Sequence, residues 1–154
     1  MIAERSHWKN LPFGEVEPVP YRATFEAGQL PLLTQGFIPR QMEDKWFIFF
    51  EEPYLFLHRS WTGQAVYRVR IERHEEGFQV TDAVCARDAV QREPEDEAKL
   101  LEFLIANLLL GESRPFPLPA GLPNAKAGIY QHAVSGTGYP IQAASGKPWW
   151  AFWR

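Results

Sequence analysis

The feature that most constrains this fold is a pair of neighbouring apolar runs in which large side chains occupy odd and even positions alike. Residues 46–50 read WFIFF, and residues 54–61 read YLFLHRSW. The sequence Glu51-Glu52-Pro53 between them suits a tight turn, because Pro53 has no N–H to donate to a neighbouring strand. The two runs therefore predict a β-hairpin. Since side chains alternate between the faces of a strand, both faces of this hairpin need a cover.

The segments that follow the hairpin extend it into a meander. Residues 65–73 alternate between apolar and charged side chains, which is the pattern of a strand with one buried face. A turn signal at residues 74–77 (HEEG) precedes a further strand over residues 78–84. Because short connections join antiparallel neighbours, we expect about four antiparallel strands within residues 45–85.

A single long amphipathic helix is predicted over residues 93–110. Pro94 suits the first turn of a helix, and the three acidic residues after it are favourable at the positive end of the helix dipole. A wide apolar stripe with helical spacing follows, formed by Leu100, Leu101, Phe103, Leu104, Ile105, Leu108 and Leu109. Gly111 is placed to end the helix. We expect this helix to cover one face of the sheet.

Proline-rich arms flank this centre. Residues 1–40 hold five prolines but also many large apolar side chains, so we expect an extended arm laid over the domain, with a short strand near residues 21–25. Residues 111–154 form a second proline-rich arm. The predicted fold class is α+β, in a single domain of residues 1–154: an antiparallel meander, one long helix packed on one face, and the two arms covering the rest.

The C-terminal arm ends in an aromatic cluster. Residues 129–134 and 139–143 are candidate short strands, and the chain closes with WWAFWR at residues 149–154. So many large aromatic side chains would favour aggregation if they were exposed. Two alternatives therefore stay open: the cluster docks on its own chain, or it binds another surface.

Composition and charge narrow the classes of function. The 154 residues have a hydrophobic share of 45% and a net charge of −3, which is the balance of a globular domain able to bury a core. A general nucleic-acid binder would show a basic stripe, so we expect no nucleic-acid partner. Residues 100–110 are too short and too polar to span a bilayer, and the start of the chain has no apolar signal segment. Since Cys85 is the one cysteine, a cytoplasmic location is expected.

The reactive side chains form no recognisable catalytic or metal-binding motif. The four histidines are scattered without the spacing of metal ligands, so no metal site is expected. The sequence Gly136-Thr137-Gly138 is typical of a turn rather than of a phosphate-binding loop, and no cofactor is expected. Cys85 lies in a strand-like run, where a cysteine is usually a small buried apolar residue. These observations favour a protein that is not an enzyme.

A polar cluster, HRSWTG at residues 58–63, interrupts the apolar centre. The length of the loop after the second strand decides on which face of the sheet each side chain of this cluster lies. One step of register moves a side chain to the other face. A three-residue loop would place His58 on the face that carries Arg68 and Arg70, whereas a two-residue loop would place it on the opposite face. We favour the three-residue loop.

In the favoured register Arg59 lies on a mostly apolar face with Leu57, Trp61 and Tyr67. A guanidinium in such a place needs an acid, a set of carbonyls or a ligand anion. In a structural interpretation, Arg59 pairs with Asp82 or Asp88, and the other polar side chains of residues 58–63 bind nearby backbone.

In a binding interpretation, Arg59 belongs to an anion pocket. The guanidinium of arginine can form paired hydrogen bonds with a phosphate or a carboxylate. Aromatic side chains that line a pocket can pack against a nucleobase or a sugar ring. The candidate ligand-binding residues are Arg59, Ser60, Trp61, Thr62, Arg87 and Asp88. Secondary candidates are His58, Arg68, Arg70, Trp149, Trp150 and Trp153. The structural and the binding interpretation both stay open.

Residues 45–110 resemble a small uncharacterised bacterial domain whose pattern runs WFIY, FHRSWTG, an (I/V)Y strand, VNRD and an acidic, leucine-rich helix start. Here the chain has WFIFFEE, FLHRSWTG with Leu57 as an additional residue, and CARD at residues 85–88 in the place of VNRD. The asparagine of the pattern is missing, and the arms are not matched. The resemblance implies a fold and no activity. Its focal site would lie at Arg59, Trp61, Arg87 and Asp88.

Three functions fit these residues. The first is a non-enzymatic binding or accessory domain for an anionic small molecule or a protein partner. The second is an enzyme that acts on a phosphorylated or nucleotide-type substrate, with Asp88 or His58 as acid or base and Arg59 stabilising charge. The third is a protein–protein interaction module that uses the C-terminal tryptophans, because aromatic residues dominate interface hot spots.

Overall fold

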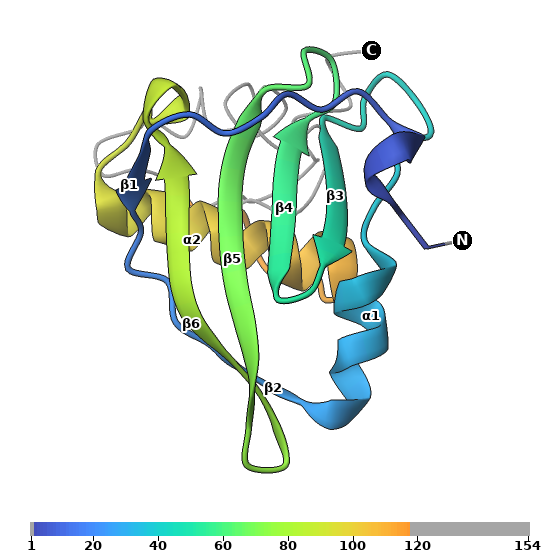
Figure 1. Ribbon diagram of the computed structural model, residues 1–154, viewed down its shortest axis with the longest axis vertical. Helices are drawn as coiled ribbons and strands as arrows, with labels where there is room; N and C mark the ends of the chain where they lie inside the picture. Colours follow the sequence, from blue (N-terminus) through green and yellow to red (C-terminus); the bar gives the residue numbers. More distant parts are fainter. Residues whose placement is uncertain (1, 118–154) are drawn as a thin grey trace, which may run out of the picture.

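A six-stranded antiparallel sheet with one helix across its back forms the framework of this α+β protein in the computed structural model, which describes residues 2–117 (Figure 1). The spatial order of the main strands is β1-β6-β5-β4-β3, and β2 also pairs with β6. The strands are β1 (Val16–Pro18), β2 (Thr24–Glu26), β3 (Trp46–Glu51), β4 (Tyr54–Arg59), β5 (Ala65–His74) and β6 (Gly77–Ala86). The predicted meander is therefore confirmed as β3 to β6.

The sheet has two more strands than the four that were predicted. Both come from the N-terminal arm and pair with the outer edge of β6, in registers such as Glu17 opposite Cys85 and Phe25 opposite Phe78. They cover an edge that would otherwise expose unpaired backbone groups. β2 lies where a short strand near residues 21–25 was predicted, whereas β1, which is three residues long and ends at Pro18, shows no alternation from which to predict it.

The N-terminal arm also contains short helical turns. These are η1 (Arg5–His7), η2 (Ala27–Gln29) and the α-helix α1 (Leu30–Gln35), none of which was predicted. In Figure 1 the chain runs from η1 across the ends of the strands to β1 on the opposite edge of the sheet. The arm thus joins both edges of the sheet.

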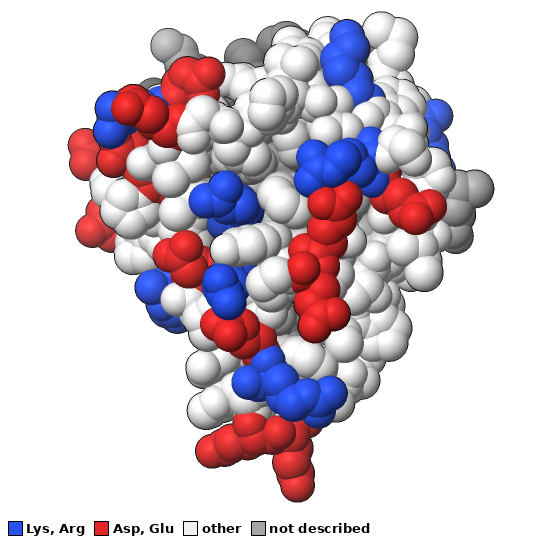
Figure 2. All heavy atoms as spheres, in the orientation of Figure 1, with Lys and Arg blue, Asp and Glu red and all other residues white. Residues whose placement is uncertain are grey.

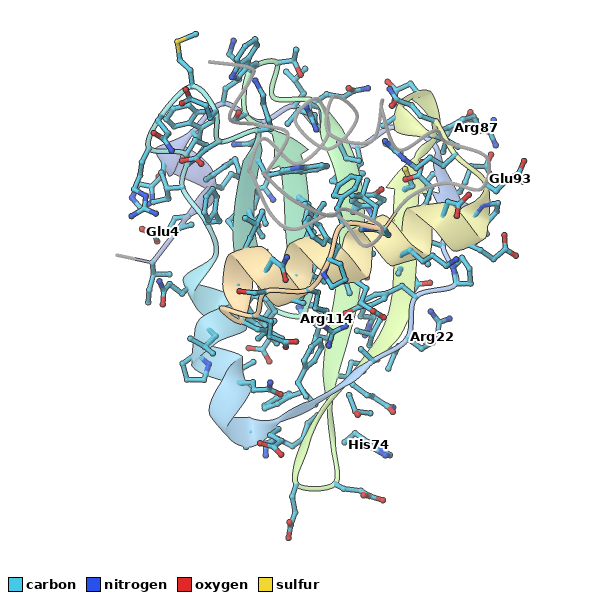
Figure 3. The ribbon with its side chains drawn as sticks, turned by 180° about the vertical axis from the view of Figure 1, so that it is seen from behind. Glu4, Arg22, His74, Arg87, Glu93 and Arg114 are labelled. Carbon is cyan, nitrogen blue, oxygen red and sulfur yellow. The ribbon has the colours of Figure 1, made fainter. Side chains whose placement is uncertain are left out.

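Helix α2 (Pro94–Leu104) continues as one π-helical segment, η4 (Ile105–Leu109), which confirms the predicted helix. The acidic first turn lies at its N-terminus, and Gly111 follows its end with a φ of 74°, a conformation that suits glycine. The apolar stripe packs on the sheet, with Leu101 and Leu104 fully buried. Figure 3 shows α2 crossing the back of the strands. Within residues 2–117, no helix is long and apolar enough to cross a lipid bilayer.

The main core lies between α2 and the sheet. Its largest buried side chains from the hairpin are Trp46, Ile48, Leu55 and Leu57, and Tyr67 of β5 stacks on Trp46 with ring centroids 6.0 Å apart. Phe116, which follows α2, closes the core by packing edge-on against Phe103. These are the side chains that alternation assigns to one face of the hairpin.

A second, smaller cluster lies on the opposite face of β3 and β4. Phe47 and Phe49 are fully buried there, with Ala3 of the N-terminal arm, and Phe56 packs against them. Arg5 lies over the rings of Phe49 and Phe56 and pairs with Glu51 at 2.7 Å. The expectation that an arm covers this face holds for β3 and β4, while the C-terminal arm beyond residue 117 lies outside the described residues.

The part of this face formed by β5 and β6 carries charged side chains instead. Figure 2 shows basic and acidic residues interleaved along it, without a continuous surface of one sign on the face in view. The ion pair between Arg70 and Glu72, at 3.1 Å, is one example. The absence of a nucleic-acid partner and a cytoplasmic location stay predictions.

The pairing of β4 with β5 confirms on which face His58, Arg68 and Arg70 lie, but the loop between the two strands differs from the prediction. Phe56 pairs with Arg68 and Tyr54 with Arg70, so His58 of the same strand shares its face with the two arginines. The connection from β4 to β5 runs from Ser60 to Gln64, which is longer than three residues, and the register between the two strands shifts at Leu57/His58, as in a β-bulge. Trp61 therefore lies in the loop and not on the face that carries Arg59, which corrects that prediction.

Candidate functional site

Ser60 ties three separate segments together at the end of the sheet. Its backbone N–H donates to the carbonyl of Lys45 at 2.9 Å, and its hydroxyl donates to the carbonyl of Asp44 at 2.7 Å. Its own carbonyl accepts the indole N–H of Trp8 at 2.8 Å. Because the hydroxyl is buried and satisfied by backbone, Ser60 acts as a structural residue that holds the loop of residues 40–45 and the N-terminal arm against the β4–β5 loop.

Gly63 holds the same loop from its other end. Its carbonyl accepts the backbone N–H of Leu11 at 2.8 Å and lies 3.1 Å from the His58 Nδ1 atom, and its N–H donates to the carbonyl of Arg59. The φ of Gly63 is 78°, in the left-handed region that favours glycine. A Cβ atom at this position would lie 2.6 Å from the Lys9 side chain. The glycine thus allows the arm to approach the loop closely.

We expect Gly63→Ala to lower the free energy of unfolding by about 1–3 kcal/mol, because it adds a left-handed alanine and a clash with Lys9. The measurement is urea unfolding followed by circular dichroism. Gly14→Ala is the matched control, since an added Cβ there meets nothing within 4 Å, and it should change stability by less than about 1 kcal/mol. Equal effects of the two substitutions would contradict this role of Gly63.

His58 is buried on the face that the N-terminal arm covers. Its ring stacks on Phe49 and meets Phe13 edge-on, with centroids 5.6 Å away in both cases. Burial lowers the pKa of His58 below its usual value, partly offset by the hydrogen bond with the Gly63 carbonyl, and the positive charge of Arg5 lowers it further. An imidazole in this setting joins two elements and is poorly placed for acid–base work at the surface.

The lowered pKa of His58 predicts a stability that falls with falling pH. Below about 6.5 the unfolded chain takes up a proton that the folded chain resists, so the folded state loses stability as the pH drops from about 6.5 toward the lower folded pKa. We expect the melting temperature of His58→Asn to change less between pH 7 and 5 than that of the wild type. His74→Asn, at an exposed position, should keep the wild-type slope. A His58→Asn slope equal to that of the wild type would contradict the assignment.

Arg59 points to the other side of the sheet. It is half-buried on the helix face, and its guanidinium lies 4.9 Å from the centre of the Trp46 ring. Burial lowers the pKa of Arg59, and the positive charge of Arg92 lowers it further. Asp82 projects from the opposite face, since it is paired in register with Arg70, so the predicted pairing of Arg59 with Asp82 is wrong.

A buried polar network at the start of α2 lies on this helix face. The Glu97 carboxylate, whose side chain is 2% exposed, accepts the hydroxyl proton of Tyr67, the backbone N–H of Gln91 at 3.0 Å and an N–H of Arg92 at 3.4 Å. Burial raises the pKa of Tyr67 well above its usual value, and the negative charge of Glu97 raises it further. The network joins β5, α2 and the loop between β6 and α2, and sequence reasoning missed it.

Arg87 and Asp88 lie in η3 (Arg87–Ala89), at the end of β6. Arg87 is exposed and pairs with Glu15 at 2.7 Å and with Glu17 at 2.8 Å, so it fastens β1 to the sheet. Asp88 is exposed, and its backbone carbonyl lies 3.5 Å from the side-chain nitrogen of Gln64. The β4–β5 loop and η3 therefore meet at one end of the sheet.

The predicted site residues separate into distinct groups. Ser60, Trp61 and Thr62 share the β4–β5 loop, where the Thr62 hydroxyl accepts the N–H of Gln64 at 3.1 Å. Arg59 lies on the helix face, and Arg87 with Asp88 lies at η3 near the same end. Those on the opposite face are His58, Arg68 and Arg70. Trp149, Trp150 and Trp153 lie outside the described residues.

An exposed aromatic surface surrounds the β4–β5 loop. We name it the indole surface and define it by Trp8, Met42 and Trp61, which are 39%, 73% and 58% exposed. It borders a groove of about 840 Å³, which Lys9, Pro39, Arg40, Gln41, Asp44 and Ser60 also line. Both indole N–H groups are bound to backbone carbonyls, that of Trp8 to Ser60 and that of Trp61 to Met42 at 3.0 Å. The two rings are thus held in place while part of their apolar surface stays exposed.

Basic side chains edge the indole surface. The Lys45 ammonium lies 3.6 Å from the centre of the Trp61 ring, and burial lowers the pKa of Lys45, with a further decrease from Arg59. Lys9 and Arg40 are exposed beside the groove. The Asp44 carboxylate is buried and accepts the backbone N–H of Arg40 at 3.0 Å. Among the residues of the indole surface and its basic edge, Trp61 was the one that the sequence analysis selected. The exposure of the others depends on contacts between segments that are distant in the sequence.

The side chains considered as nucleophile, acid or base, which are Cys85, His58 and Asp88, lie in different settings. Cys85 is buried, and burial together with the negative charge of Glu97 raises the pKa of its thiol to about 12, so it is a poor nucleophile. From residue 2 to residue 117, no cluster of His, Cys, Asp or Glu side chains is arranged to hold a metal ion. His58 is buried in the sheet, whereas Asp88 is exposed in η3.

Comparisons with protein-family models, with curated proteins and with solved structures find no match for this chain. The resemblance of residues 45–110 to the small bacterial domain therefore stays a prediction.

Proposed function

We propose that this protein is a non-enzymatic binding domain that docks a partner protein on the indole surface. The observation that carries this proposal is the pair of exposed tryptophan rings, each fixed by an N–H bond to a backbone carbonyl, beside a groove of about 840 Å³. Exposed aromatic residues with nearby arginine are the composition of interface hot spots. Single exposed apolar residues are ordinary, whereas three large ones around one groove are not.

The fixed rings favour binding for an entropic reason. A side chain that is free before binding loses rotamer freedom when a partner immobilises it, at about 0.5–1.5 kcal/mol each. Trp8 and Trp61 are already held by their N–H groups, and Lys45 covers part of Trp61. Their apolar surface can therefore be buried at a lower entropic cost than that of free side chains.

The chemistry of the groove defines the partner. Because both indole N–H groups are occupied, the rings offer apolar contact rather than hydrogen bonds, which suits an aromatic or large aliphatic side chain. Lys9, Arg40 and Lys45 lie at the edge of the surface and attract carboxylates. The partner is thus an acidic peptide segment that carries an aromatic or large aliphatic residue. Its binding should weaken as salt increases.

An enzyme that uses Asp88 or His58 is the less supported function. A general acid or base must lie within hydrogen-bond reach of the reacting group. His58 is enclosed by Phe13 and Phe49, and its Nδ1 atom is engaged with the Gly63 carbonyl. Asp88 is exposed at another element, and the geometry of residues 2–117 gives the two no common pocket.

A selection from a random peptide library displayed on phage tests the proposed function. The bait is the full chain, with Met42→Glu and the double variant Trp8→Ala/Trp61→Ala as counter-selections. Met42 is 73% exposed, so Met42→Glu keeps the fold while it adds a carboxylate to the surface. We expect peptides that are rich in Asp and Glu around an aromatic or aliphatic residue and that bind the wild type in preference to both variants. Peptides that bind all three proteins equally, or no enrichment at all, would overturn the proposal.

A further inference from the structure

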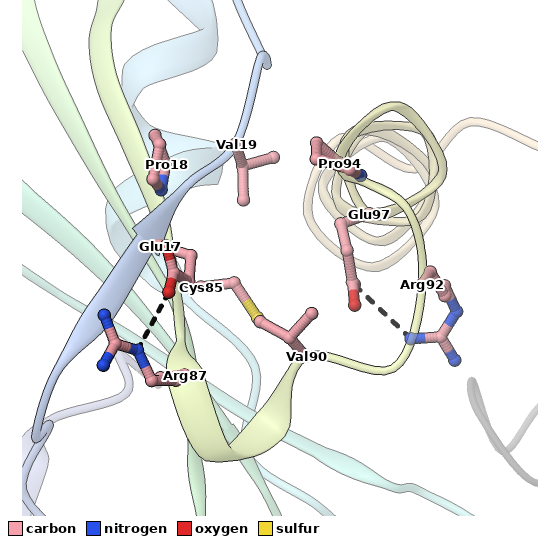
Figure 4. A pocket seen from close by; sticks show the side chains of 9 residues that line it. All are labelled: Glu17, Pro18, Val19, Cys85, Arg87, Val90, Arg92, Pro94 and Glu97. Carbon is pink, nitrogen blue, oxygen red and sulfur yellow. Dashed lines mark hydrogen bonds and ion pairs between the residues drawn. The ribbon is translucent and has the colours of Figure 1, made fainter.

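A second hollow, separate from the groove of the indole surface, lies between β1, the end of β6 and the start of α2 (Figure 4). Its volume is about 490 Å³, within the range of small-molecule sites in proteins. Figure 3 places Arg87 and Glu93 at this corner of the molecule. The two hollows share none of their lining residues.

The floor of this pocket is apolar. The side chains that form it are Pro18, Val19, Cys85, Val90 and Pro94. In Figure 4 the Cys85 side chain points toward Val90, between the strand side and the helix side of the pocket. Because the pKa of the Cys85 thiol is raised by burial, the thiol is an apolar contact surface here and not a reactive group.

Two ion pairs form facing walls above this floor. On the strand side, Arg87 binds Glu17 at 2.8 Å, and on the helix side, Arg92 binds Glu97 at 3.4 Å (Figure 4). The Arg92 side chain is 10% exposed and that of Glu97 is 2% exposed, whereas Arg87 and Glu17 are open to solvent at the mouth. The described lining thus carries two positive and two negative groups.

We propose that this pocket binds a small zwitterion with an aliphatic side chain, such as a free aliphatic amino acid. A ligand with net negative charge would meet the Glu17 and Glu97 carboxylates, and one with net positive charge would meet the two arginines. A ligand that carries both charges can turn each toward its opposite. Its aliphatic part then covers Pro18, Val90 and Pro94, the exposed apolar side chains of the lining, so that their apolar surface is buried.

The walls also set the orientation of the ligand. The ligand carboxylate lies toward Arg92 on the helix side of the pocket. The ligand ammonium lies toward Glu17 at the mouth, because the Glu17 side chain is 45% exposed and binds Arg87 through its Oε1 atom, whereas that of Glu97 is 2% exposed and binds Tyr67, Gln91 and Arg92. The pocket therefore distinguishes the two ends of an amino acid.

Calorimetric titration of the full chain with L-leucine tests this proposal. The matched probes are 4-methylpentanoate, which lacks the ammonium, and 3-methylbutylamine, which lacks the carboxylate. We expect both probes to bind at least about tenfold more weakly than leucine, since each lacks one of the two charged groups that Arg92 and Glu17 would bind. Glycine, which lacks the aliphatic part, should also bind more weakly.

Variants locate the site. Val90→Trp fills the pocket from a position that is 39% exposed, and it should abolish leucine binding while the melting temperature stays near that of the wild type. Leu32→Trp, at a position with the same exposure outside the pocket, should leave binding unchanged. No heat of binding with leucine, an equal affinity for either singly charged probe, or binding that survives Val90→Trp would each overturn the proposal. Because Val90 lies apart from the indole surface, Val90→Trp should leave the peptide selection unchanged.

Discussion

Replacing Glu97 by alanine should lower the free energy of unfolding by about 3–5 kcal/mol, the cost of breaking a buried charge pair by removing one partner. The carboxylate is 2% exposed and accepts hydrogen bonds from three residues in two other segments, Tyr67 of β5 and Gln91 and Arg92 of the loop before α2. Its removal leaves the fully buried Tyr67 and the nearly buried Arg92 without this acceptor. For a chain of this size the melting temperature should fall by at least about 6 °C.

Glu95→Ala is the control for this prediction, because Glu95 lies in the same first turn of α2 but is exposed. Its loss removes only a favourable interaction with the helix dipole, so stability should change by about 1 kcal/mol or less. Chemical unfolding in urea, with the slope m compared between variants, gives both values. If Glu97→Ala proved as mild as Glu95→Ala, the network would not hold the helix to the sheet.

A comparably large effect is expected for Phe49→Ala, on the opposite face of the sheet. Phe49 is fully buried beneath the N-terminal arm, in contact with the rings of Phe47, Phe56 and His58. Truncation of a buried phenylalanine to alanine costs about 3–5 kcal/mol. It also removes one of the two rings beneath Arg5, so the arm should detach more readily.

The release of the arm has its own measurement. Trypsin cleavage after Arg5 and Lys9 should be faster in Phe49→Ala than in the wild type, under conditions in which both remain folded. Phe78→Ala, at a half-buried position of β6 far from Arg5, is the control and should leave cleavage at these sites unchanged. Equal cleavage of Phe49→Ala and wild type would mean that this face does not hold the arm.

The parts of the fold that could be predicted are those with a periodic pattern. Alternation located β3 to β6 and the faces of Trp46 and Phe47, and helical spacing located α2. A short strand was predicted near residues 21–25, where β2 lies, but β1 escaped prediction because its partner, β6, lies far away in the sequence and β1 itself is three residues long and ends at Pro18. Pairing of that kind is decided by the assembled sheet rather than by local preference.

The candidate site was less predictable than the fold. Within the HRSWTG sequence, Ser60 and Gly63 bind backbone groups of two other segments. Their effect is to hold Trp61 beside Trp8, a residue that no pattern in the sequence marked as part of a site. The Glu97 network escaped notice because an acid in the first turn of a helix looks like a dipole-stabilising surface group until its burial is known.

The most direct test of the proposed binding surface is the set of indole N–H signals in a nitrogen–proton correlation NMR spectrum. The chain has six tryptophans, so six indole signals are expected, and Trp8→Phe and Trp61→Phe assign two of them. Titration with a peptide from the selection should shift the Trp8 and Trp61 signals and leave that of the buried Trp46 in place. Shifts confined to the signals of Trp149, Trp150 and Trp153, with those of Trp8 and Trp61 unchanged, would contradict binding at the indole surface and would instead favour the C-terminal aromatic cluster as the interaction module.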